Sequence, residues 1–98
     1  MGDFLEAVVL LLPADAGGRV LPISPREGTY RPVVGSMRVR FIEGPPTIEP
    51  GSSGLVVVEL ETAADRDLAA GSELEILEQD RVVGILTVTR LWRKALAV

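Results

Sequence analysis

Residues 72–92, SELEILEQDRVVGILTVTRLW, contain two segments of strand character separated by two residues. In 72–78, Leu74 and Ile76 alternate with glutamates, and 81–92 continues as a longer run rich in valine and leucine. Alternation with a period of two predicts half-buried strands, and the short connection at Gln79 and Asp80 predicts a β-hairpin. Gly84 in the second strand predicts a bend or close packing. This stretch favours an all-β fold.

The same signal recurs in three segments nearer the N-terminus. Phe4–Leu12 is an apolar run of strand length that ends at Pro13. Apolar and polar side chains alternate at the far end of Thr29–Ile42 and along Leu55–Glu61. Gly35 within Thr29–Ile42 predicts a bulge or a tight bend. The side chains expected to face inward are Met37, Val39 and Phe41 in one strand and Val56, Val58 and Leu60 in the other.

The remaining segments are expected to be connections. Pro22 and Pro25 interrupt the region that begins with Arg19–Ile23, which is expected to be a loop or an edge strand. Thr47 and Ile48 form a short extended piece in a turn-rich stretch. Residues 62–73, TAADRDLAAGSE, favour a loop with one turn of helix, and the tail 93–98 is not assigned.

Length and composition fit one domain over residues 1–98. The chain has 98 residues, of which 47% are hydrophobic, with ten glycines and seven prolines dispersed along it. A chain of this size buries one core, and about six strands are most economically placed in a small closed antiparallel barrel, because closure leaves no sheet edge exposed.

The residue types that carry most enzyme chemistry are missing or isolated. The chain has no histidine and no cysteine, so its serines have no adjacent base and no thiolate is present. The carboxylate pairs Asp65–Asp67 and Glu73–Glu75 resemble a solvated sheet face and lack the ligand spacing of a calcium loop. We therefore expect no enzyme activity, no metal and no cofactor.

The N-terminal segment predicts a cytoplasmic protein with no membrane association. Its apolar run at Ala7–Leu12 is far shorter than the roughly 20 residues that span a membrane, and Asp3 and Glu6 stand where a secretion signal needs basic residues. Glu6 also occupies the position where a myristoylation signal needs serine or threonine.

Charge is distributed unevenly around a net value of −4. The region 19–40 holds five arginines and one glutamate, and 81–98 is basic, while 59–80 holds eight acids and one arginine. If the basic regions adjoin in the fold, they form a positive face suited to phosphate or carboxylate groups. The alternative is that this arginine use reflects composition alone.

The stretch 17–32, GGRVLPISPREGTYRP, places Arg19 and Arg31 around a loop fixed by glycine and proline. So much backbone control favours a loop that contacts a partner. The alternative is that both arginines anchor loop carbonyls and only shape the rim of the barrel.

Three motifs in this order give the chain a resemblance to a known family. They are Gly17-Gly18-Arg19 with Pro22, then Tyr30-Arg31-Pro32, then the hairpin with Arg81 to Gly84. Together they resemble the third domain of translation elongation factor Tu over nearly the whole chain. The resemblance implies a six-stranded antiparallel Greek-key barrel, here as a stand-alone unit. In that family this region helps to hold the T stem of transfer RNA, and the GTPase domain is separate, so no GTP site is expected in this chain.

Departures from the family pattern change the expected partner. Val20 stands where the family has histidine, and LEILEQD at 74–80 carries acids where the family has arginines. We therefore expect a non-enzymatic binding module that binds a protein or an anionic partner through an arginine-bearing loop. A transfer-RNA-binding, translation-associated protein is the alternative. The partner-binding residues expected from these arguments are Arg19, Tyr30, Arg31, Arg38 and Arg40.

Overall fold

The computed structural model describes residues 3–61, 64 and 67–92. Its six strands are β1 Phe4–Leu11, β2 Val33–Val34, β3 Met37–Glu43, β4 Ser53–Leu60, β5 Glu73–Glu78 and β6 Arg81–Trp92. Two short 3-10 helices, η1 Ala14–Ala16 and η2 Pro25–Glu27, lie in the connection between β1 and β2. The all-β prediction is confirmed.

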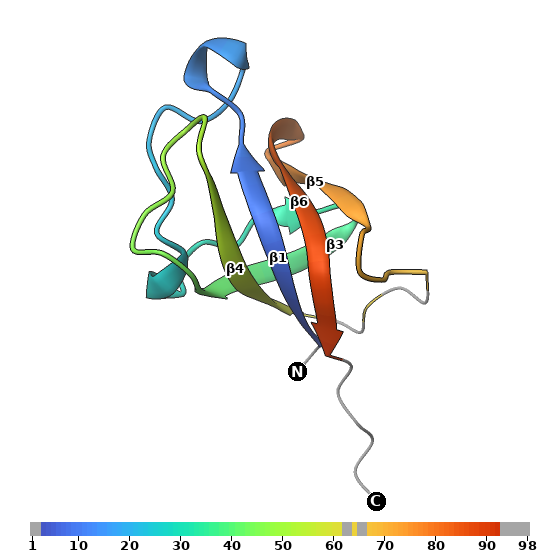
Figure 1. The fold of residues 1–98 in the computed structure, drawn as a ribbon. Coiled ribbons are helices and arrows are strands. Elements are labelled where there is room, and N and C mark those ends of the chain that lie inside the picture. The colour runs from blue at the N-terminus through green and yellow to red at the C-terminus, as the bar shows by residue number, and fades with distance from the viewer. Residues whose placement is uncertain (1–2, 62–63, 65–66, 93–98) are drawn as a thin grey trace, which may run out of the picture.

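The strands form a closed antiparallel barrel in the order β1-β4-β3-β2-β5-β6. Figure 1 shows β1 between β4 and β6, its two hydrogen-bonded neighbours. The strands β2, β3 and β4 follow one another as a meander, and β1 lies beside β4, which is the Greek-key arrangement. The long β1–β2 connection contains the 17–32 segment, so its path sets where Arg19 and Tyr30 lie.

The core is filled by the inward side chains of the strands. Phe41 is its largest fully buried side chain. The inward sets expected from the alternation of β3 and β4 are buried, and β1 adds Leu5, Ala7, Val9 and Leu11, which are all fully buried. Packing of these aliphatic side chains against one another is the main source of stability of the barrel.

The prediction of one strand over Thr29–Ile42 is wrong, because the chain reverses inside it. Gly35 and Ser36 form a tight turn between β2 and β3, and Val34 pairs with Met37 across it. The tight bend predicted at Gly35 is therefore confirmed, and it produces a hairpin where a single strand was expected.

The segment Arg19–Ile23 is a loop, which is one of the two forms expected for it. Of Arg19–Ile23, only Ile23 takes part in β pairing, through an isolated bridge to Ile48. This bridge also accounts for the extended piece expected at Thr47 and Ile48. Ala64 and residues 67–72 form turns and no helix, and the rest of the stretch in which a helical turn was expected lies outside the described residues, as does the tail 93–98.

The hairpin expected at 72–92 is confirmed, and its turn is strained. Gln79 and Asp80 have φ values of 51° and 66°. A two-residue turn needs positive φ at both central residues to match the twist of the strands, which is why glycine and asparagine are preferred there. The close packing predicted at Gly84 is confirmed, because a Cβ atom at this position would lie 2.8 Å from the carbonyl oxygen of Leu10.

Candidate functional site

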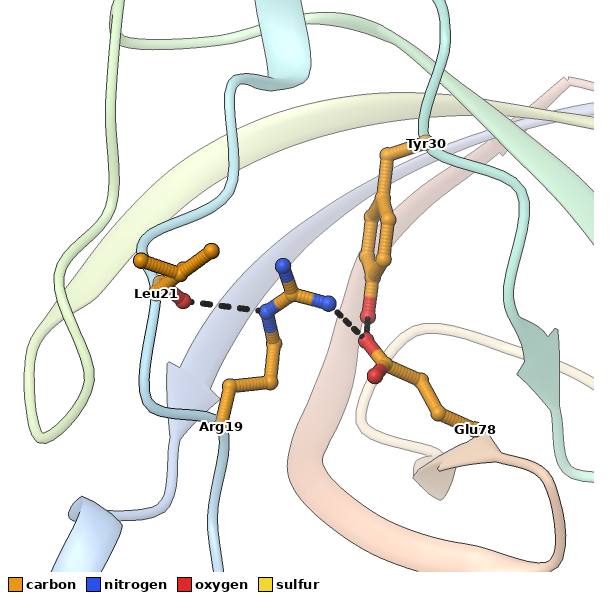
Figure 2. Close-up of polar contacts among 4 residues, drawn as sticks. All are labelled: Arg19, Leu21, Tyr30 and Glu78. Carbon is orange, nitrogen blue, oxygen red and sulfur yellow. Dashed lines mark hydrogen bonds and ion pairs between the residues drawn. The ribbon is translucent and has the colours of Figure 1, made fainter.

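Arg19 and Tyr30 meet at one carboxylate, that of Glu78. The guanidinium of Arg19 donates a hydrogen bond to Glu78 Oε2 and forms an ion pair with it, and the Tyr30 hydroxyl donates to the same oxygen. Figure 2 shows the two side chains approaching Glu78 from different segments of the chain. The Arg19 guanidinium also lies over the Tyr30 ring, with its Cζ atom 5.2 Å from the ring centroid. We call these three residues the Arg19–Tyr30–Glu78 cluster.

Each member of the cluster is positioned by a different part of the fold. Arg19 follows the turn at the end of β1, and its Nε atom donates to the carbonyl oxygen of Leu21 at 3.1 Å. The Tyr30 ring packs edge-on against Phe41, with ring centroids 5.1 Å apart. Glu78 is the last residue of β5. Arg19 thus has the carbonyl-anchoring role that the alternative interpretation of the loop gave it.

The Tyr30 hydroxyl is held in its protonated form. Burial raises the pKa of Tyr30 well above its ordinary value of 10.0, and the hydrogen bond to Glu78 and the charge of that carboxylate raise it further. A hydroxyl with such a pKa donates a hydrogen bond but does not act as a base near neutral pH. The cluster is therefore suited to fixing the loop.

We expect stability to fall with rising pH above 10.0, the ordinary pKa of this group. The folded state holds the Tyr30 proton more tightly than the unfolded state, so the stabilisation is complete below that pH and is lost as the pH rises above it. Melting temperatures of the wild type and Tyr30→Phe across the alkaline range check this. Because the chain has one tyrosine, tyrosinate absorbance reports on this residue alone. Parallel melting profiles for the two proteins would contradict the expectation.

A cleft lies beside the cluster and is bordered by two further arginines. Arg31 and Arg81 line it together with Tyr30 and Glu78, and a shallower extension reaches Arg19. Both Arg31 and Arg81 are exposed. The ion pairs found among the described residues join Arg19 to Glu78 and Arg40 to Glu59, so neither occupies Arg31 or Arg81. We call this hollow the arginine cleft.

Arg81 is a site residue that the sequence reasoning missed. It is paired with Glu78 across the hairpin, directly beside the turn. A two-residue turn at Gln79 and Asp80 requires this pairing, so the predicted hairpin contained the signal that Arg81 lies next to Glu78. The contact between Glu78 and Arg19 joins residues 59 positions apart in the chain, so no local sequence pattern predicts it.

Arg38 and Arg40 lie on β3, outside the arginine cleft. Arg38 is exposed and pairs in register with Val33, which lines the cleft, so it borders the site one strand away. Arg40 donates to Glu59 Oε1 at 2.8 Å and is engaged in that ion pair. Of the five residues expected to bind a partner, the structure brings together Arg19, Tyr30 and Arg31.

The carboxylate pairs considered in the sequence form no centre in the described residues. Glu73 and Glu75 are exposed on β5, and Asp65 lies outside the described part of the chain. Residues 3–61, 64 and 67–92 contain no group of three or more side chains arranged to hold a metal ion. Among the same residues, no helix has the length and apolar character needed to cross a membrane.

Comparison with known proteins returned no match, either to a protein-family model or to a curated protein. The relation to the third domain of elongation factor Tu therefore stays a prediction, carried by the motifs in this chain.

Proposed function

We propose that this chain is a non-enzymatic binding module, and that the arginine cleft binds an acidic, partly apolar surface of a partner protein. The observation that carries the proposal is the position of Arg31 and Arg81, two exposed guanidinium groups on one hollow with no ion pair among the described residues. Guanidinium groups bind carboxylates with two parallel hydrogen bonds, which gives orientation as well as affinity.

Three features favour a protein partner over RNA. Val20 and Leu21 lie beside the cleft with 81% and 68% of their surfaces exposed, and a protein partner gains from covering such side chains. The Glu78 carboxylate already neutralises Arg19, so Arg31 and Arg81 are the guanidinium groups left at the cleft, which suits a few carboxylates of a protein better than the run of phosphates in RNA. Net charge of −4 opposes the general attraction of the chain to nucleic acid.

The proposed module is cytoplasmic and related to the third domain of elongation factor Tu. The Greek-key strand order supports this relation, as does the meeting of the Gly-Gly-Arg and Tyr-Arg-Pro motifs at one cluster. In this proposal the rim that contacts transfer RNA in that family contacts a protein here, because Glu78 neutralises Arg19.

The test measures binding of a fluorescent synthetic peptide of glutamate and leucine by anisotropy. We expect Arg31→Gln and Arg81→Gln each to weaken binding about tenfold, because each removes a charged hydrogen-bond donor. Arg90→Gln is the matched control, since Arg90 is an exposed arginine stacked on Trp92 at 4.6 Å and does not line the cleft. Equal affinity for all four proteins would overturn the proposal.

The transfer-RNA alternative is tested by a filter-binding titration at several salt concentrations. We expect no salt-dependent binding of bulk transfer RNA at low ionic strength. Affinity that falls steeply with salt and is lost in Arg31→Gln would replace the protein partner with RNA.

A further inference from the structure

A second surface, on another part of the barrel, exposes aliphatic side chains where a solvated face should be polar. On β1, Val8 and Leu10 point outward with 41% and 47% of their surfaces exposed. Leu55, opposite Val8 on β4, is 52% exposed, and Ile85 lies opposite Leu10 on β6. Outward-facing positions of an isolated barrel are normally polar, so this aliphatic group needs an explanation.

Val8, Leu10 and Ile85 line a groove that runs across β1, β6 and β5, while Leu55 lies outside its described lining. Its floor is aliphatic, and its β5 side carries Glu73 and Glu75, both exposed. Hydroxyl groups of Ser53 and Thr87 complete the described lining. We call it the β1–β5 groove. It shares no described lining residue with the arginine cleft.

The charged side chains that line the groove are all negative among the described residues. Its described lining residues include two carboxylates and no arginine or lysine. Neither Glu73 nor Glu75 belongs to an ion pair formed within the described residues. An occupant that buries the aliphatic floor must therefore supply positive charge along one side, because a desolvated carboxylate without a counter-charge is costly.

We propose that the β1–β5 groove binds a basic amphipathic segment of a partner protein, with aliphatic side chains on the floor and lysine or arginine beside Glu73 and Glu75. The barrel is closed around β1, so the segment cannot add a strand and binds through its side chains, as an amphipathic helix does in a groove. A second copy stacked groove to groove would offer no base to these carboxylates, because the described lining contains none. Nucleic acid is disfavoured for the same reason of charge.

The test uses two fluorescent synthetic peptides, one of lysine and leucine and one of glutamate and leucine, with anisotropy as the measurement. The double variant Glu73→Lys/Glu75→Lys is expected to bind the lysine peptide about tenfold more weakly than the wild type does, and the glutamate peptide more tightly. The control Glu43→Lys/Glu61→Lys reverses the same number of exposed carboxylates outside the groove and is expected to leave both affinities unchanged. Leu10→Ser is expected to weaken binding of the lysine peptide by removing part of the floor.

Three outcomes would overturn this inference. The first is that the two double variants bind the lysine peptide with equal affinity. The second is that the wild type does not bind this peptide even at a concentration of about 1 mM, which would detect even a very weak affinity. The third is self-association in sedimentation experiments that Leu10→Ser abolishes, which would assign the groove to a second copy. If residues 93–98, RKALAV, are required for that self-association, the chain's own tail is the occupant.

Discussion

Gly18→Ala is expected to lower the free energy of unfolding by about 3 kcal/mol or more, a large part of the roughly 5–15 kcal/mol typical of a domain. A Cβ atom at this position would lie 2.1 Å from the carbonyl oxygen of Leu12, and 2.8 Å from that of Pro13. Both atoms belong to the backbone, so the side-chain adjustments that relieve most small clashes are not available. Urea denaturation followed by tryptophan fluorescence measures the loss.

Gly17→Ala is the matched control for this prediction. Gly17 has a φ of 90°, but a Cβ atom there would have no neighbour within 4 Å. Alanine at Gly17 is therefore expected to cost only the penalty of a left-handed conformation, about 1–2 kcal/mol. An equal loss in the two variants would contradict the prediction, because Gly18 has no positive φ and its larger loss is expected from the backbone contact. The comparison matters for the site, because the same turn delivers Arg19 to Glu78.

Local alternation was sufficient to predict the strands, and it failed where a non-local contact decides the structure. The half-buried strands β3, β4, β5 and β6 show clear patterns because each puts one face on the core. The two-residue β2 has no such pattern, and it is a strand only because β3 and β5 pair with both of its sides. Because β2 has no pattern of its own, the sequence predicts a single strand over Thr29–Ile42 where the structure has β2, a turn and β3.

The candidate site was predictable in part for a related reason. Arg19, Tyr30 and Arg31 stand out because glycine and proline fix the loop that carries them. For Glu78, the sequence shows only an acid where the resembled family has a base. Its contact with Arg19 joins residues far apart in the chain and is not predictable from local pattern. Exposure of Val8 and Leu10 was hidden in an apolar run, because a strand with both faces apolar looks the same whether its outer face is covered or free.

Phe41→Ala is expected to cost about 4 kcal/mol of unfolding free energy, the middle of the roughly 3–5 kcal/mol range for a buried aromatic ring replaced by alanine. Phe41 is the largest side chain among those fully buried, and it lies at the centre of β3, so its removal leaves a cavity that the closed barrel cannot easily collapse. Phe41→Leu keeps most of the volume and is expected to cost about 1 kcal/mol. Thermal and urea denaturation measure both losses.

The contact between Phe41 and Tyr30 links this core position to the arginine cleft. With their rings 5.1 Å apart and inclined at 73°, the pair is expected to contribute about 1 kcal/mol beyond its buried area. A double-mutant cycle of Phe41→Leu and Tyr30→Leu measures that coupling. Independent losses in the cycle would mean that Glu78 and Arg19, rather than Phe41, hold the Tyr30 ring at the wall of the cleft. A coupling of the expected size would mean that the core of the barrel itself fixes that wall, so that the cleft lined by Arg31 and Arg81 has a rigid aromatic side.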